Sequence, residues 1–150
     1  MANTFVLESK LVTMTVENLK IVDLVEDASP RVLCLDDRFE INVDVLFKPS
    51  FEPLLDCLLD NHTIDCYFGI ESIGPGNEIQ IRQSLTTRVG QYKYTIRTGV
   101  KTPRELGLSE KTIYMIAVGV LFQCAELREN VRGCNSLISG FDTSDCFFVA

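Results

Sequence analysis

The sequence has no tryptophan and a single histidine, His62, among its 150 residues. Without tryptophan, the chain cannot build the Cys-Trp-Cys core that marks true immunoglobulin domains. One histidine, combined with cysteines that form no CxxC or CxC pair, leaves no local zinc-binding pattern. His62 follows Asp60 and Asn61 in an expected turn, where an exposed histidine is more often inert than a general base.

Recognisable enzyme motifs are also missing. The chain contains no P-loop, HExxH, GxSxG or GxGxxG pattern. Gly74-Pro75-Gly76 contains a G-x-G, but Pro75 removes an amide donor that a phosphate cradle would use, so this segment is interpreted as a turn. We therefore assign no catalytic residue and no cofactor, and we expect a protein without enzymatic activity. An enzyme that uses one of the cysteines is the alternative, and it would need an exposed thiol of lowered pKa.

Long hydrophobic runs and clusters of positive charge are absent as well. The longest nearly apolar run, Ile113–Phe122, is shorter than the about 20 apolar residues that a membrane-spanning helix needs, so it predicts a buried strand and no membrane insertion. The N-terminal residues show no secretory signal, which favours a cytoplasmic protein. The net charge is −7, from 21 acidic and 14 basic residues, and the basic residues are scattered, which argues against nucleic acid as a partner.

Cysteine, in contrast, is frequent for a cytoplasmic chain. Cys66 alternates in phase with Ile64 and Phe68, and Cys124 alternates in phase with Phe122, so both are expected to face the core. In a reducing compartment we expect free thiols that act as small hydrophobic side chains, with disulfide, redox and metal roles as minor alternatives. The six cysteines are Cys34, Cys57, Cys66, Cys124, Cys134 and Cys146.

The clearest pattern in the sequence is the alternation in Phe39–Lys48. Its odd-numbered positions are apolar, and its even-numbered positions are polar except for Leu46. This period of two predicts a strand with one buried face, which needs a second layer to cover it. Similar patterns predict further strands, within Thr4–Val16, Leu19–Glu26, Val32–Leu35, Thr63–Ile73, Glu78–Leu85, Tyr92–Arg97, Thr112–Cys124, Leu137–Phe141 and Cys146–Val149.

The stretch after Val16 allows two interpretations. Apolar residues at Val16, Leu19 and Val22 recur every three positions, as on a helix. The density of β-branched residues favours a strand instead, separated from the preceding one by a turn at Glu17-Asn18.

Turn and helix signals separate the other strands. Gly74–Asn77 is the plainest turn signal, and Thr86–Gly90 suits a hairpin loop. Pro49–Asn61 carries leucines one helical turn apart and predicts a short amphipathic helix. Thr102–Glu105 has the form of a capping box with proline at the first helical position, so one helical turn is predicted over Pro103–Leu106.

These segments predict a single all-β domain over residues 1–150. The strand spacing predicts a two-sheet antiparallel sandwich of immunoglobulin-like architecture, with one or two short helices at the crossings. A closed barrel is the alternative, and the sandwich is favoured because Phe39–Lys48 is long and apolar on one face only. Thr112–Cys124 is apolar on both faces, so both are expected to be covered. Small Ala117 and Gly119 would let a neighbouring element or another subunit approach its second face.

Two groups of side chains are candidates for binding. Tyr67, Tyr92 and Tyr94 are expected on an outer sheet surface, where tyrosine suits contact with a partner, although ordinary cross-strand pairing would also explain them. Acidic loops form a weaker group, because carboxylate oxygens bind calcium if the loops meet at one rim. The calcium candidates are Asp36, Asp37, Asp142 and Asp145.

The absence of catalytic motifs and the strand that is apolar on both faces together favour a non-catalytic protein-interaction or self-association module. Its expected partner is another protein or a second copy in a homo-oligomer. The alternative is a carrier that holds a small apolar ligand in a cavity between the sheets.

Overall fold

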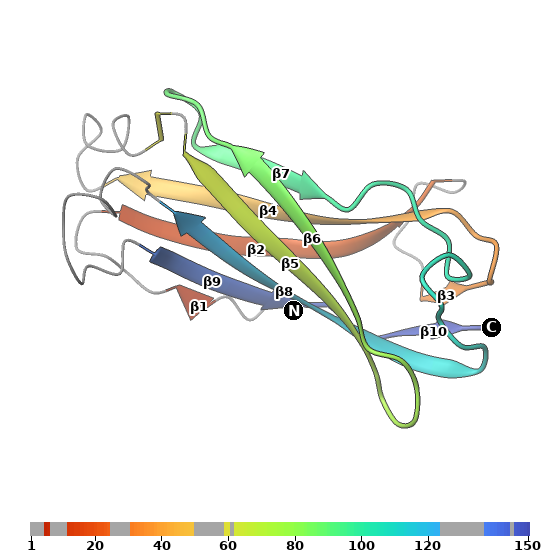
Figure 1. Ribbon diagram of the computed structural model, residues 1–150. Helices are drawn as coiled ribbons and strands as arrows, with labels where there is room; N and C mark the ends of the chain where they lie inside the picture. The colour runs from red at the N-terminus through yellow and green to blue at the C-terminus, as the bar shows by residue number, and fades with distance from the viewer. Residues whose placement is uncertain are drawn as a thin grey trace.

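The computed structural model describes residues 5–6, 12–24, 31–49, 59–60, 62–123, 137–144 and 146–150, which form an all-β arrangement of two sheets (Figure 1). These residues include no helix, and hence none long and apolar enough to cross a membrane. The strands are β1 (Phe5–Val6), β2 (Val12–Asp23), β3 (Val32–Leu33), β4 (Phe39–Pro49), β5 (Thr63–Ser72), β6 (Ile79–Thr86), β7 (Lys93–Arg97), β8 (Thr112–Gln123), β9 (Leu137–Thr143) and β10 (Phe147–Val149).

The seven-stranded sheet, called the large sheet below, is built around β8. One edge of β8 pairs with β5, and β5 pairs in turn with β6, which is the outermost strand on that side. The other edge of β8 pairs with β9 toward one end and with β10 toward the other. Strand β9 binds β1, and β10 binds β3 in the one parallel pair among the described strands. The two sheets are therefore mostly antiparallel, as the sequence predicted.

The three-stranded sheet, called the small sheet, has the order β2-β4-β7. Its central strand β4 is the alternating segment that dominates the sequence, so that prediction is confirmed. The pairing of β2 with β4 shifts between Glu17 and Lys20, and Asn18 has a φ of 57°. The turn expected at Glu17-Asn18 is therefore a β-bulge inside one continuous strand.

Both sheets contribute side chains to one hydrophobic core. On β4, the inward residues from Phe39 to Phe47 are at most 3% exposed. Phe47 meets Phe122 of the large sheet with ring centroids 5.1 Å apart, which joins the two layers. Cys66 is fully buried beside these residues, as its sequence phase predicted. The largest side chains that are less than 2% exposed include Tyr114, Phe39, Phe68, Phe122 and Phe147.

The segment Thr86–Gly90 is not a hairpin loop, so that prediction is wrong. Strand β6 pairs with β5, whereas β7 pairs with β4, and the connection between them crosses from the large sheet to the small sheet. The Tyr94 hydroxyl holds this crossing, because it accepts a hydrogen bond from the Arg88 amide at 2.9 Å and donates to the Arg88 carbonyl at 3.1 Å. Glycine and polar residues indicate where a chain bends, but they do not specify which strand the next segment joins.

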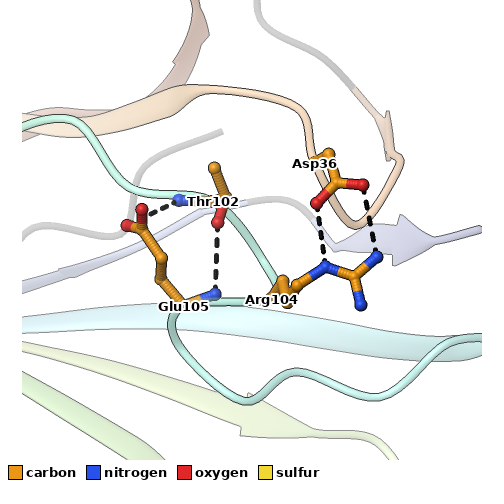
Figure 2. A network of polar contacts seen from close by, with 4 residues as sticks. All are labelled: Asp36, Thr102, Arg104 and Glu105. Carbon is orange, nitrogen blue, oxygen red and sulfur yellow. Dashed lines mark hydrogen bonds and ion pairs between the residues drawn. The ribbon is translucent and has the colours of Figure 1, made fainter.

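The predicted short helices are not seen among the described residues. Residues 103–107 form a turn, although the expected capping contacts are present (Figure 2). The Glu105 amide donates to Thr102 Oγ1 at 3.1 Å, and the Thr102 amide donates to Glu105 Oε2 at 3.4 Å. Gly107 has a φ of 71°, which ends the turn, and a single turn is too short to form a stable helix. Of the helix predicted over Pro49–Asn61, Pro49 belongs to β4, residues 59–60 form a turn, and the rest lies outside the described residues.

Candidate functional site

The outer faces of the two sheets differ in chemistry. On the small sheet, Lys93 Nζ lies 3.9 Å from Asp44 Oδ2, and Arg97 Nη1 lies 3.6 Å from Glu40 Oε1. The Thr95 hydroxyl also donates to Asp44 Oδ1 at 2.8 Å. These paired charges and hydroxyls form a polar surface that is stable in contact with water, so no further layer has to cover it.

The outer side of β8, at the centre of the large sheet, is apolar instead, with Glu71 of β5 and Ser139 of β9 among the polar residues beside it. Alternate residues of β8 point away from the core, and Ile113 at one end is 46% exposed. Ile113 is in register with Phe148 on β10, and Phe148 is in register with Val32 on β3, which is 56% exposed. A row of large apolar side chains thus crosses three strands. The sequence predicted that both faces of β8 are covered, whereas this end of its second face is exposed.

The centre of the same face has a floor of small residues. Gly69 of β5 is in register with Ala117 of β8, and the next row joins Tyr67, Gly119 and Phe141. A Cβ atom added at Gly119 would meet no other atom within 4 Å, so the space above it is open. Phe141 is 41% exposed and stands beside this space. The small residues allow the close approach that the sequence predicted, with an aromatic side chain on each side. We call this surface, made of Val32, Tyr67, Gly69, Ile113, Met115, Ala117, Gly119, Leu121, Phe141 and Phe148, the apolar face.

A polar cluster borders the apolar face on the β6 side. Asp65 Oδ1 accepts hydrogen bonds from the Ser84 hydroxyl at 2.5 Å and from Arg82 Nη2 at 3.2 Å. The Arg82 guanidinium also lies 5.5 Å from the centre of the Tyr67 ring. The hydrogen bond to Asp65 raises the pKa of Arg82, so the guanidinium stays charged. This arrangement fixes Tyr67 at the boundary between the apolar face and the polar strand β6.

The structure does not bring the three candidate tyrosines together. Tyr67 lies half-buried on the outer face of the large sheet, as expected. Tyr92 precedes β7, on the small sheet, and its carbonyl accepts the Phe47 amide at 2.8 Å. Tyr94 is only 2% exposed, its ring meets the Phe47 ring at a centroid distance of 6.1 Å, and burial raises the pKa of its hydroxyl. The expected outer position is therefore wrong for Tyr94, which serves the core.

The acidic candidates for calcium binding have other partners. Arg104 donates two hydrogen bonds to Asp36, at 2.8 and 3.2 Å, and lowers the pKa of that carboxyl (Figure 2). Asp37 accepts the Cys34 amide at 2.8 Å, and Asp142 is fully buried on β9. Asp145 lies outside the described residues. In the part of the chain that the structure describes, no three His, Cys, Asp or Glu side chains are placed so that they could hold a metal ion.

His62 also departs from its expected position. Its side chain is 6% exposed, and its ring centroid lies 6.2 Å from that of Phe122, so it belongs to the edge of the core. The His62 amide donates to Thr87 Oγ1 at 3.0 Å, and Thr87 is itself buried. The exposed turn expected around His62 is therefore wrong at this residue.

The residues that sequence reasoning missed are those at the exposed end of the apolar face. The apolar second face of β8 was a visible signal in the sequence, and it drew attention to Ala117 and Gly119. Val32 and Phe148 gave no such signal, because they reach Ile113 only through the parallel pairing of β3 with β10.

The chain matches no protein-family model, and no curated protein or solved structure is significantly similar to it.

Proposed function

We propose that this chain is a non-catalytic protein-interaction module that binds a protein partner through the apolar face of its large sheet. The observation that carries the proposal is the contrast between the two outer faces. Contiguous apolar surface rimmed by polar residues marks interaction sites, whereas scattered apolar residues do not. The exposed row of Ile113, Phe148 and Val32 is contiguous in register.

The composition of the apolar face supports the same function. Interface centres are rich in aromatic residues and methionine and poor in charge. Phe141, Tyr67 and Met115 provide those side chains, and the open space above Gly119 gives a partner's side chain room to enter.

The proposed scaffold is a two-sheet sandwich of immunoglobulin-like architecture, supported by two mostly antiparallel sheets that share one core. The proposed location is the cytoplasm, supported by the free thiols of Cys34, Cys66 and Cys146.

A carrier for a small apolar ligand would place that ligand between the sheets. Large side chains from both layers occupy that space: Phe39, Phe68 and Tyr114 are all fully buried there. The space between the sheets is therefore filled by side chains, and the apolar face on the outside is the surface that we propose for binding.

Selection of a random displayed-peptide library on the purified protein tests this function. Peptides bind protein-interaction sites preferentially, so the selected sequences should bind the apolar face. Ile113→Glu or Phe141→Glu should weaken their binding at least tenfold, equivalent to about 1.4 kcal/mol. Leu46→Glu is the matched control, because Leu46 is a half-buried apolar residue on the outer face of the polar small sheet. Peptides that bind all three variants as well as the native chain would contradict the proposal.

A further inference from the structure

Strand β6 is an outermost strand of the large sheet and is less protected against pairing than the other described edges. Proteins usually protect sheet edges by short strands, lysine, proline or bulges. The other described edges follow this rule: β1 and β3 have two residues each, β2 carries the bulge at Asn18, and β7 is five residues long with Lys93 and Arg97. Strand β6 has eight residues, neither lysine nor proline, and an unbroken register with β5. Its one charged residue, Arg82, is paired with Asp65 of β5.

Hydrogen bonding next to β6 shows which of its backbone groups point outward. The Thr87 amide donates to the His62 carbonyl at 2.7 Å, and these residues continue the register of Thr86 with Thr63. Hydrogen-bonded and non-hydrogen-bonded pairs alternate along an antiparallel ladder. Odd-numbered residues of β6 therefore bond to β5, and even-numbered residues direct their N–H and C=O groups to the open edge. No described residue bonds to these outward groups, which belong to Gln80, Arg82, Ser84 and Thr86.

We propose that β6 pairs with β6 of a second copy of this chain, antiparallel and across a two-fold axis at Gln83. In this register Arg82 lies opposite Ser84 of the second copy, and Gln80 lies opposite Thr86. All four outward residues then exchange backbone hydrogen bonds with the partner strand. The proposal concerns a different surface from the apolar face and does not depend on the proposed function.

Charge and apolar contacts select this register over its neighbour. Centring the axis on Arg82 would place two guanidinium groups directly opposite each other, which is unfavourable. Centring it on Gln83 removes that clash, because Arg82 then faces Ser84 of the second copy. The same register sets Ile81 beside Leu85 of the second copy, and both are half-buried apolar residues at the margin of the core. In this register the strand avoids a like-charge contact and pairs its own apolar residues.

The pairing has a geometric consequence for the dimer. A two-fold axis perpendicular to the sheet turns one copy onto the other without exchanging its faces. The two large sheets join into one continuous sheet, and both apolar faces lie on the same side of it. A dimer formed in this way presents two apolar faces in parallel, and if these bind a partner, the dimer binds it bivalently.

Light scattering coupled to size exclusion, with sedimentation equilibrium up to about 500 µM chain, tests the pairing. The native chain and Ser84→Ala should dimerise, whereas Ser84→Pro should be monomeric, because proline removes an outward N–H and adds steric bulk at the edge. Ser84→Ala is the matched control, since both variants lose the hydroxyl contact with Asp65. A native chain that stays monomeric, or a Ser84→Pro chain that dimerises like Ser84→Ala, overturns the proposal.

A pair of charge variants tests the register and does not rely on proline being tolerated. Gln80→Glu with Thr86→Lys places opposite charges across the interface at two positions, and it should tighten the dimer several-fold. Gln80→Lys with Thr86→Lys places like charges there and should weaken it several-fold. Equal dissociation constants for the two double variants would overturn the register. Ile113→Glu, which alters only the apolar face, should dimerise like the native chain, so the outcome stays separate from that of the proposed function.

Discussion

The backbone amide of Leu19 donates a hydrogen bond to Oδ2 of Asp142 at 3.1 Å, which links the small sheet to the large sheet. The bulge at Asn18 turns the Leu19 amide away from the ladder with β4 and leaves it without a strand partner. Asp142, which is fully buried, supplies the missing acceptor, and its other oxygen accepts the Thr143 amide at 2.9 Å. The carboxylate expected to be a calcium ligand instead joins the two sheets.

Replacing Asp142 should destabilise the fold in proportion to the acceptors that are lost. Asp142→Ala leaves two amides without acceptors and should lower the free energy of unfolding by about 3 kcal/mol. Asp142→Asn keeps one acceptor oxygen and should lower it by about 1 kcal/mol. Urea unfolding followed by circular dichroism measures both values. An alanine variant as stable as the native chain would show that water replaces the carboxylate and that the link is dispensable.

Cys66 should make the stability fall at alkaline pH. Burial raises the pKa of its thiol to about 12, whereas the ordinary value is 9.0. Above pH 9 the unfolded chain therefore holds fewer protons than the folded chain, so the free energy of unfolding falls as pH rises. This thiol lowers the free energy of unfolding by at most about 1.4 kcal/mol for each pH unit between about pH 9 and pH 12, and by progressively less at lower pH.

The Cys66→Ala variant isolates this effect. Its core is less well packed, so its stability is lower at every pH, but the contribution of the thiol to the alkaline slope is gone. Urea unfolding of both chains at a series of pH values gives the two slopes. Parallel slopes would mean that Cys66 does not titrate differently on folding.

Two glycines should respond in opposite ways to alanine. Gly119→Ala should raise the free energy of unfolding by about 0.5 kcal/mol, because alanine is less costly to order in a strand and its methyl group meets no atom within 4 Å. Gly76→Ala should lower it by about 1 kcal/mol, because the new Cβ would lie 2.6 Å from the Ser72 Cβ and force the turn to move. Thermal unfolding of the two variants beside the native chain decides the matter, and a destabilised Gly119→Ala would indicate that the space above Gly119 is filled.

The capping contacts of Thr102 should stabilise the turn even though no helix follows. Thr102→Ala removes the acceptor for the Glu105 amide and should lower the free energy of unfolding by about 1 kcal/mol. Thr102→Ser keeps the hydroxyl and should remain close to the native value. If serine and alanine lower the stability equally, the methyl group of Thr102 matters and its hydroxyl does not.

Periodicity in the sequence was sufficient to identify the long strands and most of the core. The alternation in β4, β5 and β8 records which face of each strand is buried, and burial is the strongest constraint on residue choice. The same alternation also places Tyr94 in phase with Ile96, so the core position of Tyr94 was available from the pattern. Its assignment to the surface rested on the general enrichment of tyrosine in interfaces, which here was misleading.

Pairing between strands could not be read in the same way. The crossing between β6 and β7, the parallel contact of β3 with β10 and the link from Leu19 to Asp142 all join segments by contacts distant in sequence. Such contacts depend on the combined burial of several strands, and no local motif encodes them. The apolar face was therefore visible only in part, as a second apolar side of β8, until its neighbours were known.

Strand β8 pairs with strands that are distant from it in the sequence, which has a consequence for the folding rate. It pairs with β5, which precedes it in the sequence, and with β9 and β10, which follow it. Strand β3 can pair only after β10 has joined the sheet. Among the described strands, only β5 and β6 pair through a short loop, the turn at Gly74–Asn77. Closing the longer loops costs entropy before the contacts form. We therefore expect folding in the range of milliseconds to seconds, with the β5–β6 hairpin as the earliest ladder.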